Sequence, residues 1–154
     1  MQVEDLLRAV PSGQWYGPEI KGEITQLVND TRNLVPGCAF VAIKGLQFDG
    51  HTAVDQVAAA GAKLMVVEVL PENWQDYPLS FFLVPSTFRA QALLANQFFG
   101  RPTEQLNVVA VTGTNGKTTI SSLISDLLMR LGHKTGLIGT LHYKVDQTYY
   151  PSIN

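Results

Sequence analysis

Cysteine is almost absent from this chain of 154 residues, since Cys38 is the only one. A single cysteine excludes an internal disulfide, and its place in an apolar run indicates a small buried side chain rather than a nucleophile. No apolar stretch approaches the roughly 18 residues of a membrane-spanning helix. The N-terminal segment MQVEDLLRAV is too acidic, and its apolar part too short, for a signal peptide. We therefore expect a cytoplasmic protein that does not enter a membrane.

An excess of basic residues is also absent. The chain has 11 lysines and arginines against 13 aspartates and glutamates, for a formal net charge of −2. Proteins that bind nucleic acid usually present a basic face, so no nucleic-acid partner is expected. With 45% hydrophobic and 16% charged residues, the chain has enough apolar side chain for one or two small globular domains.

Apolar runs and turn signals predict strands that alternate with helices, which is typical of an α/β fold. The predicted strands are residues 23–30, 38–43, 63–69, 80–84, 106–111 and 135–139, with a hairpin over 143–150. Helices are predicted over residues 3–10, 51–60 and 86–99, and a fourth helix ends before Gly132. We place a domain boundary at Gly100-Arg101-Pro102, which separates residues 1–101 from residues 102–154.

Two of these helices have an apolar stripe of the kind that faces a core. In the helix over 86–99, the side chains that share one face are Phe88, Ala92, Ala95 and Phe99. In the helix before Gly132, the stripe consists of Ile120, Leu123, Ile124, Leu127, Leu128 and Leu131. Residues 135–139, after that helix, are predicted to form the next parallel strand.

The segment GTNGKT, residues 113–118, has the composition of a phosphate-binding loop between a strand and a helix. Gly113 and Gly116 would let the backbone approach phosphates, and the helix that follows directs the positive end of its dipole at them. Lys117 would hold the β- and γ-phosphates, Thr118 a Mg²⁺ ion, and Thr119 the α-phosphate side. The alternative is a glycine-rich turn with a solvated lysine. The predicted ATP-binding residues are Gly113, Thr114, Asn115, Gly116, Lys117, Thr118 and Thr119.

The spacing of this loop departs from the usual motif, because Val111 stands where the first glycine is expected. The stretch TGTNGKTT, residues 112–119, resembles the ATP loop of the Mur ligase family, in which the short spacing is the normal form. The resemblance implies an N-terminal α/β domain that binds a UDP-linked substrate, followed by a central P-loop α/β domain. It covers the whole chain but only part of a family enzyme. We therefore expect a complete substrate domain, 1–101, and the beginning of an ATP-binding domain, 102–154.

A second stretch resembles the UDP-sugar-binding domain of two members of this family. It comprises NDTRNLVPGCAFVAIKG, residues 29–45, and FDGH, residues 48–51. The resemblance places the uracil at residues 46–48, and it puts Thr31 where the family commonly has serine. Taken alone, the stretch is also compatible with a structural turn and a buried strand. The substrate-binding residues that the resemblance implies are Asn29, Thr31, Arg32, Leu46, Gln47, Phe48 and Asn154.

Two side chains in this stretch have more than one interpretation. Arg32 could pair with the diphosphate of the ligand, or with the nearby carboxylate of Asp30 or Asp49. For His51, which has no partner in view in the sequence, a polar residue at the start of a helix is favoured over a ligand contact. The residue pattern does not decide between the two roles of Arg32.

The resemblance implies ATP-dependent amide ligation in the synthesis of peptidoglycan precursors. ATP would phosphorylate the free carboxylate that ends UDP-N-acetylmuramoyl-L-alanyl-D-glutamate, and the amine of a third amino acid, meso-diaminopimelate or L-lysine, would displace the phosphate. Lys117 is the predicted catalytic residue, and the predicted cofactors are ATP and Mg²⁺. The predicted partners are the UDP-linked dipeptide and the amino acid. The full-length form is expected to be a monomer, and this chain alone is expected to be inactive.

Three other functions are compatible with parts of the sequence. One is the related ligation of D-Ala-D-Ala to the UDP-linked tripeptide. TGTNGKTT and the IGT at 138–140 favour addition of the third amino acid over this ligation. Another is a UDP-sugar-binding module without catalysis. The last is a P-loop phosphotransferase or GTPase switch, which the lack of an N-K-x-D segment in this chain argues against.

Overall fold

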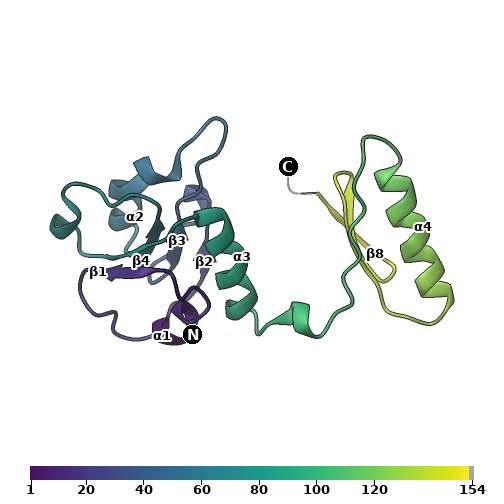
Figure 1. Cartoon of the computed structure of the whole chain (residues 1–154), viewed down its shortest axis with the longest axis horizontal. Helices are drawn as coiled ribbons and strands as arrows, with labels where there is room; N and C mark the ends of the chain where they lie inside the picture. Colours follow the sequence, from purple (N-terminus) through teal and green to yellow (C-terminus); the bar gives the residue numbers. More distant parts are fainter. Residues whose placement is uncertain (153–154) are drawn as a thin grey trace. The chain divides into compact units, whose positions relative to one another are not determined.

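The computed structural model describes residues 1–152, and the chain divides into two compact units, Met1–Leu106 and Asn107–Asn154. The predicted boundary at Gly100-Arg101-Pro102 lies shortly before this division. Both units combine helices with a sheet, so the predicted α/β class is confirmed (Figure 1). Within residues 1–152, no helix combines the length and the apolar character needed to cross a membrane.

The first unit is built on a five-stranded sheet with the order β1-β5-β4-β3-β2. Four of its strands run parallel to their neighbours, and only β1 is antiparallel, to β5. The strands are β1 (Gln14–Tyr16), β2 (Leu27–Val28), β3 (Ala39–Val41), β4 (Leu64–Val67) and β5 (Ser80–Leu83). Each lies inside or beside an apolar run that the sequence marks as a strand, except β1, which was not predicted.

The central strands β3 and β4 are buried on both faces, which is why their sequences are almost continuously apolar. Alternate side chains point to opposite sides of the sheet. On one side, Val41 and Val66 pack with Leu6 of α1 and Leu94 of α3. On the other side, the side chains that pack with Val57 of α2 include Phe40 and Met65.

Helices cover both faces of this sheet (Figure 1). The α-helices are α1 (Val3–Leu7), α2 (Val54–Ala59) and α3 (Thr87–Phe98). Short 3-10 turns complete the unit. η2 (Gly50–Ala53) precedes α2 and η4 (Pro102–Glu104) follows α3, whereas η1 (Thr31–Asn33) and η3 (Trp74–Asp76) lie in connections between strands. The predicted N-cap of α3 is present, since the Ser86 hydroxyl accepts a hydrogen bond from the Arg89 amide.

The predicted inner face of α3 is wrong. Phe88 and Phe99 are exposed, whereas Thr87, Ala90 and Leu94 are buried. Ala90 and Leu94 belong to the core cluster that α3 forms with the sheet and with α1, so this second face is the one that packs inward.

The second unit contains one long helix, α4 (Lys117–Arg130), and a three-stranded antiparallel sheet. The strands are β6 (Gly136–Ile138), β7 (His142–Val145) and β8 (Thr148–Pro151). The predicted hairpin is confirmed, with Asp146 at a positive φ of 50° in its turn. Thr135, before β6, is joined to α4 through the Ser125 hydroxyl. Lys144 of β7 is joined to α4 through the carboxylate of Asp126.

Two strand predictions in this unit are wrong. Residues 106–111 form no strand, because no described segment pairs with their backbone. Residues 136–138 do form a strand, but β6 pairs antiparallel with β7 rather than in parallel. The apolar stripe of α4 is correspondingly uncovered in the part of the chain that the structure describes, since Ile120, Leu123 and Leu127 are all exposed.

Candidate functional site

The parallel strands of the first unit direct the loops that follow them toward one edge of the sheet. In open α/β sheets, ligands bind beyond this carboxyl edge. Residues 29–32 follow β2 and residues 42–50 follow β3. The two loops meet around a hollow of about 440 Å³, which we call the carboxyl-edge pocket. It is lined by Asn29, Asp30, Thr31, Arg32 and Phe48.

In the turn after β2, Arg32 is bonded to the neighbouring carboxylate of Asp30. The Asp30 carboxylate accepts hydrogen bonds from the Arg32 amide at 2.9 Å and from its side-chain Nε at 3.0 Å. These bonds and the guanidinium charge lower the pKa of Asp30 to about 2. The Arg32 side chain is otherwise exposed, so the pairing with Asp30 is the contact it makes among the described residues.

Thr31 lies between these two charged residues in the sequence and lines the pocket, and its side chain is hydrogen-bonded to neither of them. Its side chain is half-buried. Within residues 1–152, no hydrogen bond of its hydroxyl is observed. A hydroxyl that faces a pocket and has no internal partner is available to a ligand as both donor and acceptor.

The loop after β3 forms a narrow projection. Lys44 and Asp49 pair as an isolated antiparallel bridge, and the Gly45 amide donates to the Phe48 carbonyl at 2.9 Å. Leu46 at the tip is fully exposed, and 54% of Phe48 is accessible. The projection therefore offers an aromatic ring to the pocket, and flat rings stack well against nucleobases.

Gly50 fixes the base of this projection against β3. A Cβ atom on Gly50 would lie 2.9 Å from the Ile43 nitrogen and 3.0 Å from the Ala42 Cα. Both are backbone atoms that cannot rotate aside, so only glycine allows this approach. The Gly50 amide also donates to the Ile43 carbonyl at 2.9 Å.

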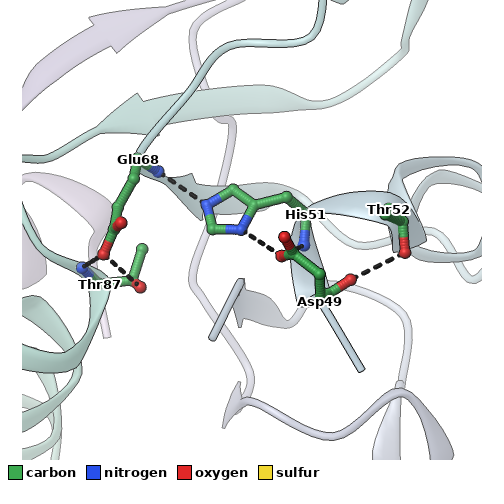
Figure 2. Close-up of polar contacts among 5 residues, drawn as sticks. All are labelled: Asp49, His51, Thr52, Glu68 and Thr87. Carbon is green, nitrogen blue, oxygen red and sulfur yellow. Dashed lines mark hydrogen bonds and ion pairs between the residues drawn. The ribbon is translucent and has the colours of Figure 1, made fainter. Parts of the chain in front are cut away.

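A series of polar contacts joins this loop to the end of β4 and the start of α3 (Figure 2). His51 Nδ1 lies 2.7 Å from the Asp49 carboxylate, and its Nε2 accepts the Glu68 amide at 2.9 Å. The Glu68 carboxylate in turn accepts the amide and the hydroxyl of Thr87, at the start of α3. The pKa of Asp49 is lowered chiefly by the His51 amide, and that of Glu68 chiefly by the Thr87 amide.

The predicted phosphate-binding loop lies in the second unit, immediately before α4. Gly113 and Gly116 have φ of +145° and +76°, which side chains other than glycine rarely adopt. Residues 113–119 are all exposed. Lys117 folds back onto the loop, where its ammonium group donates to the carbonyls of Gly113 at 2.5 Å and Thr114 at 3.3 Å.

The structure brings together part of the predicted substrate set. Asn29, Thr31, Arg32 and Phe48 share the carboxyl-edge pocket, while Leu46 and Gln47 lie on the projection and are not among its lining residues. Asn154 falls outside the described residues.

Sequence reasoning missed the contact between Glu68 and Thr87. An acidic residue directly after a buried strand, followed by the helix start Ser86-Thr87, is the signal that could have indicated it.

Family models match nearly the whole chain. Residues 23–114 match the catalytic domain of the Mur ligase family, and residues 111–154 match the Mur ligase middle domain. Among curated relatives, the UDP-N-acetylmuramoyl-L-alanyl-D-glutamate–2,6-diaminopimelate ligase of Geobacillus kaustophilus is 41% identical over all 154 residues. The chain spans 30% of the length of that relative.

Solved structures resemble the chain as well. Crystal structure II of MurF from Acinetobacter baumannii superposes with a TM-score of 0.65 and 31% identity, over 90% of this chain and 29% of that one. The MurF ligase from Thermotoga maritima in complex with ADP gives a TM-score of 0.51 and 34% identity, over 68% of this chain and 23% of that one.

Proposed function

This chain belongs to the Mur ligase family, and from that premise we propose that it carries the substrate site and the ATP loop of a peptidoglycan-precursor ligase. The proposed reaction adds the third amino acid to UDP-N-acetylmuramoyl-L-alanyl-D-glutamate. The name of the Geobacillus kaustophilus relative favours 2,6-diaminopimelate as that amino acid. The carboxylate of the dipeptide would take the γ-phosphoryl group of ATP, and the amine would then displace phosphate from the acyl phosphate.

The carboxyl-edge pocket would bind the uridine diphosphate part of the substrate. Phe48 offers an exposed ring for the uracil. Thr31 offers a hydroxyl without an internal partner, and the Asn29 amide at the pocket wall can both donate and accept hydrogen bonds. Arg32 supplies positive charge for the diphosphate while its Nε remains bonded to Asp30.

The loop at 113–119 would bind ATP. The first amides of α4 and the positive end of its dipole favour an anion at this place. Lys117 would exchange its carbonyl contacts for phosphate oxygens, which bear far more negative charge. Its catalytic role would be to hold the γ-phosphate while charge develops during transfer.

The predicted Mg²⁺ ion would be bound together with ATP at this loop. Within residues 1–152 no cluster of three or more His, Cys, Asp or Glu side chains could hold a metal ion. Mg²⁺ is usually held by one or two protein oxygens plus phosphates. Thr118 would supply its hydroxyl, which makes no hydrogen bond among the described residues, and the ion would neutralise phosphate charge.

The observation that carries this proposal is the meeting of residues 29–32 with Phe48 in one pocket at the carboxyl edge. Calorimetric titration of the chain with UDP-N-acetylmuramoyl-L-alanyl-D-glutamate and with UDP tests it. We expect saturable binding of both, weakened about fivefold to tenfold by Thr31→Ala, since one hydrogen bond to a ligand is lost. Absence of binding by the folded chain would contradict the proposal.

Ligation of D-Ala-D-Ala to a UDP-linked tripeptide is the second candidate. The likeness to MurF from Acinetobacter baumannii favours it. The same titration with the UDP-linked tripeptide separates the two candidates. Tighter binding of the dipeptide supports addition of the third amino acid, and tighter binding of the tripeptide supports the alternative.

A further inference from the structure

His51 lies beside the carboxyl-edge pocket but is not one of its lining residues. Its side chain is only 19% exposed, and both ring nitrogens are engaged within the protein. A ring without a free nitrogen cannot also bind a ligand through hydrogen bonds. The contribution of His51 therefore lies in the two protein groups that its ring connects, Asp49 and Glu68.

The partners of the ring determine its protonation. Glu68 contacts Nε2 through its backbone amide, which can only donate, so Nε2 must accept and carry no proton. The Asp49 carboxylate is an acceptor, so Nδ1 must carry the proton and donate it. The ring is thus neutral. It donates from Nδ1 to the Asp49 carboxylate and accepts at Nε2 from the Glu68 amide.

These two contacts tie together segments that are separated in sequence. Asp49 ends the projection that carries Phe48, whereas Glu68 directly follows β4 in the centre of the sheet. The polar contacts continue from the Glu68 carboxylate to Thr87, at the first turn of α3. The projection is thereby attached, through one imidazole ring, to the end of the neighbouring strand β4 and, through Glu68, to the start of α3 (Figure 2).

We propose that His51, as its neutral Nδ1–H tautomer, is a positioning residue that holds residues 46–48 in the arrangement that places the Phe48 ring in the carboxyl-edge pocket. The mechanism is preorganisation. An exposed projection has few apolar contacts of its own, so without an anchor it would sample many conformations and would have to be ordered when a ligand binds. The consequence for ligand affinity rests on the proposed function, whereas the order of the loop does not.

Three variants separate the contacts of the ring. His51→Gln retains an acceptor near the place of Nε2, His51→Asn retains a donor near the place of Nδ1, and His51→Phe retains only the ring shape. His133→Gln is the matched control, because His133 is exposed in the second unit.

The first measurement needs no ligand. Long-range ¹H–¹⁵N correlation spectra of the unmodified chain should show a proton on Nδ1 of His51 and none on Nε2. ¹⁵N relaxation should then show residues 46–48 as ordered in the unmodified chain and in the control. In all three His51 variants they should be markedly more mobile, with the largest loss in His51→Phe.

The second measurement is titration with UDP. We expect about tenfold weaker binding by His51→Phe, smaller losses for His51→Gln and His51→Asn, and no change for His133→Gln. An Nε2–H tautomer in the unmodified chain would overturn the proposal without any variant. Unchanged order of residues 46–48 in folded His51→Gln and His51→Asn would also overturn it. If the unmodified chain does not bind UDP, the proposed function fails, and the relaxation data still decide the role of His51.

Discussion

Gly50→Ala is the substitution that most directly tests how the projection is held against the sheet. The added Cβ would lie 2.9 Å from the Ile43 nitrogen, 3.0 Å from the Ala42 Cα and 3.1 Å from the Ala42 carbonyl carbon. All three atoms belong to the backbone that leaves β3, so no rotamer change relieves the overlap. Either the loop or the end of the strand must move.

Overpacking of this kind costs about 1–3 kcal/mol of stability. For a unit of about 100 residues, each kcal/mol lowers the melting temperature by roughly 4–8 °C. We therefore expect urea unfolding of Gly50→Ala to show a loss of about 1–3 kcal/mol. The Phe48 ring should be displaced at the same time, because Asp49 and His51 flank the glycine, so UDP affinity should also fall.

Gly139→Ala is the control for this experiment. A Cβ there would lie 3.5 Å from the His142 carbonyl oxygen, an ordinary contact distance, so neither stability nor UDP affinity should change measurably. The two readouts together decide the outcome. If Gly50→Ala changes stability by less than about 0.5 kcal/mol and leaves the affinity for UDP unchanged, the close approach of Gly50 does not position the loop.

Three further substitutions have defined expected results. Lys117→Ala should weaken ATP binding about tenfold or more in a titration with Mg·ATP, whereas Lys134→Ala, an exposed lysine of the same unit, should not; equal affinities would refute the phosphate role. Arg32→Ala should raise the pKa of Asp30 from about 2 toward 3.8 in a ¹³C NMR titration. Because the pKa of Asp30 is depressed in the folded state, the ion pair stabilises the fold at pH values above 3.8, and this stabilisation is lost as the pH falls toward 2. An unchanged pKa of Asp30 in Arg32→Ala would show that the ion pair does not form in solution. Phe40→Ala, at a fully buried position, should lower the free energy of unfolding by about 3–5 kcal/mol in urea, and a loss below about 1 kcal/mol would contradict its place in the core.

The strands of the first unit could be predicted because their signal is local. Strands buried on both faces need apolar side chains at every position, and the runs that contain β3 and β4 have them. The inner face of α3 could not be predicted in the same way. Its sequence has apolar residues on more than one side, and only the packing against the sheet and α1 shows that Ala90 and Leu94 point inward rather than Phe88.

Strand pairing in the second unit depended on segments that sequence patterns do not bring together. Residues 106–111 are apolar enough for a strand, but a strand also requires a neighbour. The hairpin of β7 and β8 directly follows β6 in the sequence, and β6 pairs with its first strand, β7. Pairing with the nearest segment in the chain has a smaller entropy cost than pairing with a distant one.

For the candidate site, sequence predicted the loops involved but not the contacts between them. The motif predicted phosphate binding at 113–119, and the family resemblance predicted substrate binding at Asn29, Thr31, Arg32 and residues 46–48. The structure brings Phe48 to residues 29–32. The polar chain from Asp49 to Thr87 was not predictable. It requires three loops to end at the same height on the sheet, and that depends on the register of β3, β4 and β5.

The central claim is that the carboxyl-edge pocket binds the uridine diphosphate part of a UDP-linked muramoyl peptide. The most direct test is to follow the backbone amides of the chain by NMR during titration with UDP-N-acetylmuramoyl-L-alanyl-D-glutamate. We predict saturable shifts concentrated at residues 29–32 and 46–51, reproduced at these positions by UDP alone. Saturable shifts elsewhere in the first unit, with these two loops unaffected, would contradict the account.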